Sequence, residues 1–298
     1  MNEVVLSIKG LSKNYGKVQA VKQLELEIPK GSVFGLLGPN GSGKTTTLGM
    51  VLGVVNPVAG SFRWFNENDD VLARKRIGAI LERPTFYPYM SGWDNLDLVS
   101  RLRSCGMDRA KDVLEMVGLY ERKDDKFKGY SLGMKQRLAI ASAMLADPEV
   151  LVLDEPTNGL DPMGIAEIRD LIRNIAAGGK TIILASHLLD EVQKVCTDFV
   201  ILKNGKKIHS GKVNSIGANT RLIELGCSDM NALQSALNNM NQIKSLVRNN
   251  DLIQVSLDAD VTAEMLCKSL AEKGIFPGHI ITREKNLEEL FLQIVNEN

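Results

Sequence analysis

The feature that most constrains the fold of this chain is the glycine-rich segment Gly38–Thr45, which reads GPNGSGKT. Its spacing matches the phosphate-binding pattern G-x-x-x-x-G-K-[ST]. The preceding SVFGLLG predicts a buried strand, and the following KTTTLGMVLG predicts a helix. Glycine adopts backbone dihedrals that a side chain would forbid, so such a loop can aim several N–H groups at one anion. The segment therefore predicts a strand–loop–helix unit built around a phosphate.

A nucleotide is the phosphate ligand that this motif predicts. In the strand–loop–helix frame the Lys44 ammonium reaches the β- and γ-phosphates, and the Thr45 hydroxyl offers an oxygen to Mg²⁺. The alternative is an ordinary glycine-rich turn without a ligand. If ATP binds here, its contacts come from Gly38, Pro39, Asn40, Gly41, Ser42, Gly43, Lys44, Thr45 and Thr46.

Composition places the chain among soluble globular proteins, because 44% of its 298 residues are apolar and 24% are charged. Lys plus Arg and Asp plus Glu each total 36, so no net charge attracts nucleic acid or anionic lipid. The N-terminal MNEVVLSIKG is not a secretion signal, and no apolar run approaches the ~18 residues of a membrane span. We expect a cytoplasmic protein, unless a partner holds it at a membrane. Its dispersed cysteines predict reduced thiols, without a disulfide or zinc site.

The sequence divides into two expected domains, residues 1–213 and 214–298. The first begins with alternating, strand-like segments and contains a helical insert from about Trp93 to Glu121. Its EVLVLDEP and KTIILASH segments are typical of strands buried on both faces of a parallel sheet, with a helix between them. This pattern predicts an α/β core, which a hairpin turning at Asn204–Gly205 follows.

The second domain reads as a small α+β unit. Its segments follow the order βαββαβ, with a hairpin signal at Asn249–Asp251, and this order predicts a ferredoxin-like fold. A further helix is expected over NLEELFLQIV, residues 286–295.

Three other stretches carry candidate catalytic residues. VLVLDE ends in Asp154 and Glu155, at the strand end where α/β sheets place their ligands; Asp154 can hold Mg²⁺ through water, and Glu155 can polarise an attacking water. ILASH ends in His187, which can contact the γ-phosphate. YSLGMKQ places Ser131 and Gly133 before a long helix, whose N-terminus can receive an anion. His209 and His279 are expected to be ordinary surface histidines.

Together these motifs, from about Val4 to Val213, resemble the ATP-binding cassette (ABC) ATPases. GPNGSGKTT resembles the Walker A loop, VLVLDE Walker B and YSLGMKQ the family signature. NGLD resembles the D-loop with Asp161, His187 matches the switch histidine, and Tyr15 lies where the family stacks an aromatic ring on adenine. The resemblance implies a P-loop NTPase fold of ABC type, ATP and Mg²⁺ as cofactors, and ATP hydrolysis.

Three residues depart from the family pattern. Glu82 stands where most members have a glutamine that touches Mg²⁺ and the attacking water, and we treat it as a working substitute in both the catalytic and the metal role. Leu132 replaces a signature glycine and Met134 replaces a glutamine, whereas Ser131 and Gly133 are kept. Phosphate contact by the signature is therefore expected, and its dimer-face hydrogen bonds are in doubt.

The resemblance also implies partners. Two cassettes clasp ATP between them in this family, so this single cassette should pair with itself or with a related ATPase, with each P-loop facing the other chain's signature. Residues 77–96 and the tail LEELFLQIV are most similar to ATPase subunits of bacterial exporters for drugs and antimicrobial peptides, of the bacitracin and lantibiotic type. This implies export of a drug, a peptide or a lipid-like substrate through separate membrane permease subunits, with the chain peripheral on the inner face of the membrane.

Other functions stay open at this point. A soluble ABC ATPase that acts on the ribosome or on nucleic acid usually carries two cassettes or a long coiled coil, whereas Walker A and Walker B lie only about 110 residues apart here. An importer ATPase is the other transport function, and a P-loop small-molecule kinase would leave the signature unexplained. The aromatic segment Phe86–Trp93 either borders the groove for a membrane subunit or packs the helical insert. The second domain is expected to stabilise the dimer or to regulate it.

Overall fold

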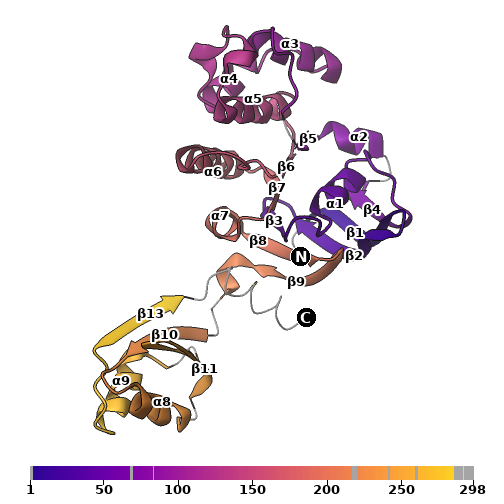
Figure 1. The fold of residues 1–298 in the computed structure, drawn as a ribbon. Coiled ribbons are helices and arrows are strands. Elements are labelled where there is room, and N and C mark those ends of the chain that lie inside the picture. The colour runs from indigo at the N-terminus through magenta and orange to yellow at the C-terminus, as the bar shows by residue number, and fades with distance from the viewer. Residues whose placement is uncertain are drawn as a thin grey trace. The chain divides into compact units, whose positions relative to one another are not determined.

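The computed structural model describes residues 3–67, 70–82, 84–216, 220–240, 242–258, 261–284 and 291. The chain forms two compact units, residues 1–211 and 212–298 (Figure 1), and the sequence placed this boundary at 213–214. The predicted helix over residues 286–295 lies, except for Phe291, outside the described residues.

An antiparallel sheet of three strands begins the first unit. Its order is β2-β1-β4, formed by β1 (Val4–Tyr15), β2 (Val18–Pro29) and β4 (Ala59–Trp64). Alternating apolar residues bury one face of the long β1–β2 ladder, as the spacing predicted. Trp64 is fully buried here, and its indole Nε1 donates to the carbonyl oxygen of Val51 at 2.7 Å. This sheet supports one side of the glycine-rich loop.

The α/β core is a six-stranded sheet in the order β5-β6-β7-β3-β8-β9. Every residue of β3, β6 and β7 is buried, which is why these segments read as continuous apolar runs. Neighbouring strands from β5 to β8 run parallel, so β3, β6 and β7 end at one edge. The strands are β3 (Val33–Leu37), β5 (Ile77–Ile80), β6 (Val150–Asp154), β7 (Thr181–Ser186), β8 (Asp198–Lys203) and β9 (Lys206–Lys212).

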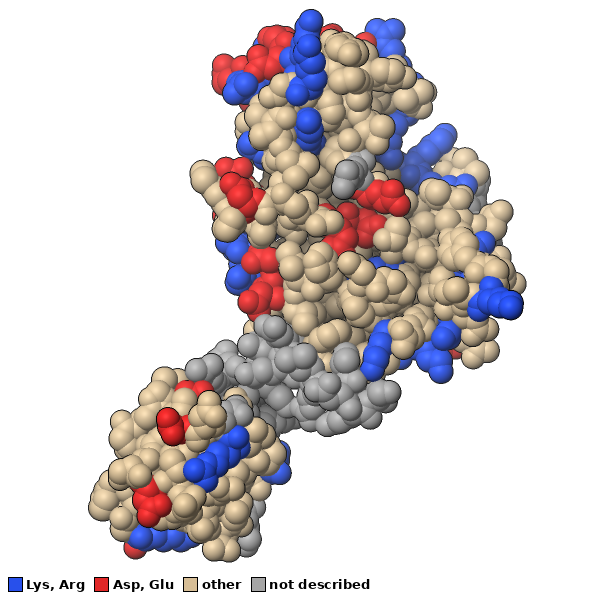
Figure 2. Space-filling model, viewed as in Figure 1, with Lys and Arg blue, Asp and Glu red and all other residues tan. Residues whose placement is uncertain are grey.

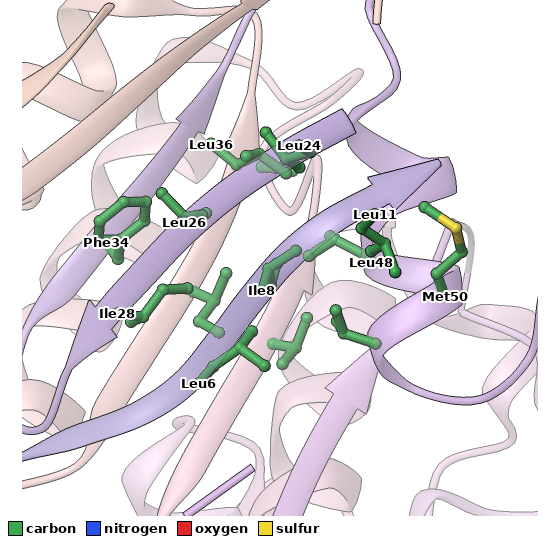
Figure 3. Close-up of a cluster of buried hydrophobic side chains, with 14 of the residues drawn as sticks. Leu6, Ile8, Leu11, Leu24, Leu26, Ile28, Phe34, Leu36, Leu48 and Met50 are labelled. Carbon is green, nitrogen blue, oxygen red and sulfur yellow. The ribbon is translucent and has the colours of Figure 1, made fainter. Parts of the chain in front are cut away.

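One hydrophobic cluster joins the two sheets to the first helix, α1 (Lys44–Val51). Figure 3 shows leucine and isoleucine side chains of β1 and β2 lying beside Phe34 and Leu36 of β3 and beside Leu48 and Met50 of α1. This packing fixes α1 directly behind the glycine-rich loop, because a close-packed interior leaves little room for a helix to shift.

The predicted helical insert is not one helix. It is divided at Ser104 and Gly106, which both adopt left-handed backbone angles (φ 53° and 69°). The expectation of a helical stretch from Trp93 to Glu121 missed this break, because serine seldom marks a left-handed helix end. The helices and 3₁₀ turns here are α3 (Gly92–Arg103), α4 (Ala110–Met116), η1 (Tyr120–Arg122), η2 (Phe127–Gly129) and α5 (Leu132–Met144).

Three other helices complete the first unit: α2 (Asp70–Lys75), α6 (Pro162–Ala177) and α7 (Leu189–Val195). Asp161 caps α6, since its carboxylate accepts a hydrogen bond from the Gly164 N–H at 2.9 Å. No helix in the described part of the chain is long and apolar enough to cross a membrane.

The second unit has the predicted βαββαβ order. Its antiparallel sheet runs β11-β12-β10-β13, and an apolar core joins this sheet to two helices. Asn250 forms the predicted hairpin turn with a left-handed backbone (φ 49°). The elements are η3 (Val213–Ser215), β10 (Thr220–Gly226), α8 (Met230–Asn238), β11 (Ile243–Asn249), β12 (Leu252–Asp258), α9 (Ala263–Ala271) and β13 (His279–Glu284).

Candidate active site

The glycine-rich loop encloses the ammonium group of Lys44. This side chain is only 5% exposed, and its Nζ donates to the carbonyl oxygens of Gly38 at 2.8 Å and Pro39 at 3.3 Å. The same Nζ lies 3.3 Å from Oε1 of Glu155. A buried ammonium is costly unless it is paired, and here loop carbonyls and a carboxylate supply the partners. A phosphate that enters the loop can take over these contacts.

Glycine is required at two positions of the loop. Gly38 and Gly43 have positive φ angles, 150° and 103°. A Cβ on Gly38 would lie 2.3 Å from the carbonyl oxygen of Leu202, and one on Gly43 would lie 2.5 Å from that of Ala20. The glycines therefore serve both the backbone path and the close approach of neighbouring segments.

A pocket of about 600 Å³ opens directly beside the loop, large enough for a nucleotide. Eight predicted site residues line it: Tyr15, Asn40, Gly41, Gly43, Lys44, Thr45, Thr46 and Glu155. The Tyr15 ring is half-exposed, and Lys13 Nζ lies 5.4 Å from its centroid. An aromatic face at one end and buried cationic and N–H donors at the other suit a base and its phosphates.

Sequence reasoning missed the remaining wall of this pocket, which is formed by Val18, Gln19, Ala20, Lys22 and Asn204. The sequence predicts the hairpin turn at Asn204–Gly205, but it does not predict that this turn packs against β2. A Cβ on Gly205 would lie 2.7 Å from the carbonyl oxygen of Ala20, so the turn packs tightly on that strand. No local pattern reports this contact, because it joins distant parts of the chain.

Asp154 ends β6 and is 2% exposed, and its Oδ1 has no hydrogen-bond partner among the described residues. Burial raises the pKa of this carboxyl, whereas a hydrogen bond with the Thr45 side chain lowers it. An unpaired buried oxygen beside a hydroxyl fits a hard cation such as Mg²⁺. No group of three or more His, Cys, Asp or Glu that could hold a metal ion lies in the described ranges.

Glu155 connects Lys44 with His187. Its Oε1 pairs with Lys44, and its Oε2 lies 2.7 Å from Nδ1 of His187, so both carboxylate oxygens are engaged. Glu155 also has a left-handed backbone (φ 49°), held by a hydrogen bond from its N–H to the carbonyl oxygen of Ala185 at 2.9 Å. Strain of this kind persists only where surrounding contacts impose it. The arrangement can hold a water against a phosphate once Lys44 turns toward that phosphate.

Glu82 follows β5, its side chain is exposed, and its backbone is left-handed (φ 60°). Burial is the main cause of the raised pKa of Asp154, and the charges of Glu155 and Glu82 add to it. Glu82 is therefore close enough for its charge to act on the Asp154 carboxyl, although it does not line the pocket. In Figure 2, Asp and Glu side chains gather in this region, between β6 and α1.

The predicted signature residues do not reach this pocket. Ser131 caps α5, accepting a hydrogen bond from the Met134 N–H at 3.2 Å, and neither it nor Gly133 lines the pocket. Asp161 likewise caps its own helix. Leu132 is 47% exposed. If Gly159 carried a Cβ atom, that atom would lie 3.3 Å from Cδ2 of Leu132. Within one chain, the pocket is therefore lined by the glycine-rich loop and the start of α1, by Glu155 after β6, by the β1–β2 region and by Asn204.

Comparisons with known proteins agree with this geometry. The family model described as ABC transporter matches residues 21–158. The bacitracin transport ATP-binding protein BcrA of Enterococcus faecalis is 34% identical over 301 residues, covering 98% of this chain and 97% of that protein. The lantibiotic transport ATP-binding protein SrtF of Streptococcus pyogenes is 38% identical over 204 residues, covering 68% of this chain and 89% of that protein.

Solved structures show the same cassette. The structure of cbiO1 from Clostridium perfringens, part of the ABC transporter complex cbiONQ, has a TM-score of 0.66 at 30% identity and covers 72% of this chain and 90% of that one. A dimeric ATP-binding cassette in a post-hydrolysis state with ADP and Pi has a TM-score of 0.62 at 26% identity, over 70% of this chain and 98% of that one.

Proposed function

The chain belongs to the ABC transporter family as an ATP-binding, ATP-hydrolysing subunit, and on that premise we propose that it powers export of a drug, an antimicrobial peptide or a lipid-like substrate. The observation that carries the catalytic part is the convergence of Lys44, Glu155 and Asp154 on the nucleotide pocket. The relatives are named for transport of bacitracin and of a lantibiotic, which supports the substrate class.

In the proposed cycle, Lys44 leaves Glu155 and the loop carbonyls and binds the β- and γ-phosphates of ATP. Glu155 is then free to accept a proton from the attacking water, while His187 holds the second carboxylate oxygen and contacts the γ-phosphate. Mg²⁺, held by Thr45 and Asp154 with Glu82 in reach, would neutralise phosphate charge when bound. Tyr15 stacks on adenine.

We place the signature in the site of a second chain. Ser131 and Gly133 do not line their own pocket, although they begin a helix of 13 residues whose first N–H groups can receive a phosphate. A copy of this chain, or a related ATPase, would bring that helix to the ATP held by Lys44, with Asp161 at the junction. The dimeric relative with ADP and Pi supports this pairing.

Separate membrane permease subunits complete the proposed transporter, with this chain peripheral on the cytoplasmic face of the membrane. The relatives named for bacitracin and lantibiotic transport support this assignment. The zero net charge gives no support to a nucleic-acid partner. For the second unit we propose an accessory role, in which it stabilises or regulates the dimer.

The test is co-expression of this chain with any membrane-spanning protein that a neighbouring gene encodes, in a strain sensitive to bacitracin and to a lantibiotic. We expect the inhibitory concentration of at least one compound to rise with the wild-type complex. It should not rise with Lys44→Ala, which removes the ammonium from the phosphate site. Energy-dependent uptake of these compounds, or the same protection by both proteins, would contradict the proposal.

A further inference from the structure

The helix α7 begins two residues after His187, and little within the helix itself holds it in place. It has seven residues, and no side chain caps its N-terminus. Isolated helices of this length are unstable in water. Val192 is its one buried residue and packs on β3, where a Cβ on Gly35 would lie 2.8 Å from Cγ1 of Val192. The placement of α7, and with it that of His187, therefore depends on neighbouring elements.

The neighbouring helix α6 supplies two arginines that bind α7, and Figure 1 shows both helices at the same side of the parallel sheet. Arg169 Nη1 donates to Oε2 of Glu191 at 3.2 Å. Arg173 Nη2 donates to the carbonyl oxygen of Lys194 at 2.7 Å. Lys194 Nζ in turn donates to Oε1 of Glu191 at 3.0 Å. Both carboxylate oxygens of Glu191 are thus held, one from α6 and one from α7 itself.

The Arg169–Glu191 pair is a poor source of stability. The two side chains are only 22% and 18% exposed. Arg169 Nε is buried, has no hydrogen-bond partner among the described residues and lies 3.9 Å from Oδ1 of Asp170. An unpaired buried donor costs free energy, and an apolar side chain often stabilises a fold as well as a buried ion pair does. A guanidinium opposite a carboxylate does fix distance and direction, so the pair sets where α7 lies.

We propose that Arg169 is a positioning residue for His187 in ATP hydrolysis. The inference rests on the proposed roles of His187 and Glu155. It adds a residue that does not line the nucleotide pocket, to which no described residue of α6 or α7 contributes. Arg169 holds Glu191, and the anchored helix α7 holds the backbone that follows His187.

The His187 ring depends on this backbone. The side chain is 36% exposed, so packing does little to hold the ring. The short turn between β7 and α7 is closed by the N–H of Leu188, which donates to Oγ of Ser186 at 3.0 Å. With α7 in place, Nδ1 of His187 lies 2.7 Å from Oε2 of Glu155. A shift of α7 would therefore weaken the contact that orients the proposed catalytic carboxylate, and catalytic rates are sensitive to such displacements.

The experiment uses the full chain with Arg169→Met, which removes the guanidinium and keeps an unbranched side chain between the helices. We expect kcat for ATP hydrolysis to fall about threefold to tenfold, with KM for ATP within about twofold and Tm within about 3 °C of wild type. Arg169→Lys, which keeps a cation opposite Glu191, should lose less. The matched control is Arg101→Met, which removes an exposed ion pair on α3 and should hydrolyse ATP as wild type does.

Two further readouts separate positioning from packing. Arg169→Met/His187→Ala should be no slower than His187→Ala, because the ring that Arg169 positions is gone. The chain has three histidines, so histidine-selective ¹⁵N labelling gives few signals, and His187→Ala identifies that of His187 Nδ1. This signal should shift in Arg169→Met and stay in place in Arg101→Met. If His187→Ala has no measurable rate, the ¹⁵N signal decides.

Unchanged kcat in Arg169→Met, an unmoved His187 signal, or a loss that multiplies with that of His187→Ala would overturn the positioning role alone. A fall in Tm of more than about 5 °C together with the loss of activity would assign Arg169 to the packing of α6 on α7, and would also overturn it. If His187→Ala hydrolyses ATP as fast as wild type, the proposed role of His187 itself fails.

Discussion

The two units of the chain differ in whether their buried side-chain polar atoms have hydrogen-bond partners. In the described residues, every buried side-chain polar atom without a hydrogen-bond partner belongs to the first unit, and these atoms include Asp154 Oδ1 and Ser42 Oγ. The core of the second unit is apolar apart from the buried Ser256. Unpaired buried atoms cost free energy, so Ser42 Oγ in the glycine-rich loop and Asp154 Oδ1 at the end of β6 are suited to pair with a ligand. The other four of these atoms lie at α4, α5 and α6.

Backbone strain follows the same division. Among the described residues, eight of the nine non-glycine residues with positive φ lie in the first unit, and two of them, Glu82 and Glu155, are predicted catalytic residues. The ninth, Asn250, forms a hairpin turn, where asparagine tolerates this conformation. Several of the others, such as Asn66 and Asn204, also lie at turns, and Ser104 ends a helix. The units therefore differ in backbone strain at the two predicted catalytic carboxylates, where no turn explains it.

The largest effect should come from Lys44→Ala. Removing the ammonium deprives the phosphates of their buried cation, and we expect ATP hydrolysis to fall by about a hundredfold or more. Steady-state phosphate release measures it. The matched control is Lys206→Ala, an exposed lysine of β9, which should leave the rate unchanged. Equal hydrolysis by Lys44→Ala and wild type would show that the glycine-rich loop of the first unit is not the phosphate site.

Glu155→Gln should slow hydrolysis by about 10²- to 10⁴-fold while retaining ATP, because the amide still hydrogen-bonds water but accepts no proton. An ATP-stabilised dimer should accumulate in gel filtration with ATP and Mg²⁺. The control, Glu115→Gln on the exposed face of α4, should behave as wild type. If this variant stays monomeric at ATP concentrations well above its Kd for ATP, the pairing of two cassettes is contradicted.

Mixing two inactive variants tests which chain supplies the signature. Lys44→Ala and Ser131→Arg should each be nearly inactive, but in mixed dimers both defects fall on one site and the other site is intact. Random exchange makes about half the dimers mixed, so about a quarter of wild-type activity should return. Mixtures of wild type with each variant show whether subunits exchange and whether a single intact site hydrolyses ATP. If both occur in these controls but the mixture of the two variants stays inactive, Ser131 does not act across the interface.

Leu237→Ala tests the independence of the second unit. This fully buried leucine of α8 lies in the apolar core, and its truncation should cost the second unit about 2–5 kcal/mol. We expect an early thermal transition in calorimetry, with ATP hydrolysis at 25 °C within about threefold of wild type. Ser235→Ala, exposed on the same helix, is the control. A parallel loss of hydrolysis would show that the second unit helps to build the site.

The smallest expected change is the change in stability from Asp154→Asn, and its sign should be opposite to that of the effect on activity. Burial raises the pKa of this carboxyl in the folded chain, so its ionised form opposes folding at pH 7. Replacing it should raise stability by about 1 kcal/mol, or a few degrees in Tm, while hydrolysis is lost.

The stability gain from Asp154→Asn should shrink as pH falls through the raised folded-state pKa toward the unfolded-state value, where the carboxyl is protonated in both states. Thermal melts at pH 7 and below pH ~4 measure the difference. Asp112→Asn, at an exposed position of α4, should show no such gain. A stability gain of the same size at both pH values would contradict the assigned cost of the buried charge.

The sequence alone determined the features that depend on neighbouring residues. Turn chemistry and apolar spacing act over a few positions, so the features that they set can be predicted from the sequence. These features are the glycine-rich loop, the two acids at the end of β6, the hairpins at Asn204 and Asn250, and the βαββαβ order. The structure agrees with each of them. The roles given to Ser131, Gly133 and Asp161 stay predictions, since within one chain these residues lie outside the nucleotide pocket.

Only the tertiary structure decided which distant residues meet. The parallel order β6-β7-β3 brings Glu155 to Lys44 and His187, and the packing of the Asn204 turn on β2 adds Gln19 and Ala20 to the pocket wall. The break at Ser104 arises in the same way, where α3 ends beside the ends of α2 and α5. Strand order and helix packing are set by burial over the whole core, so no local pattern encodes them.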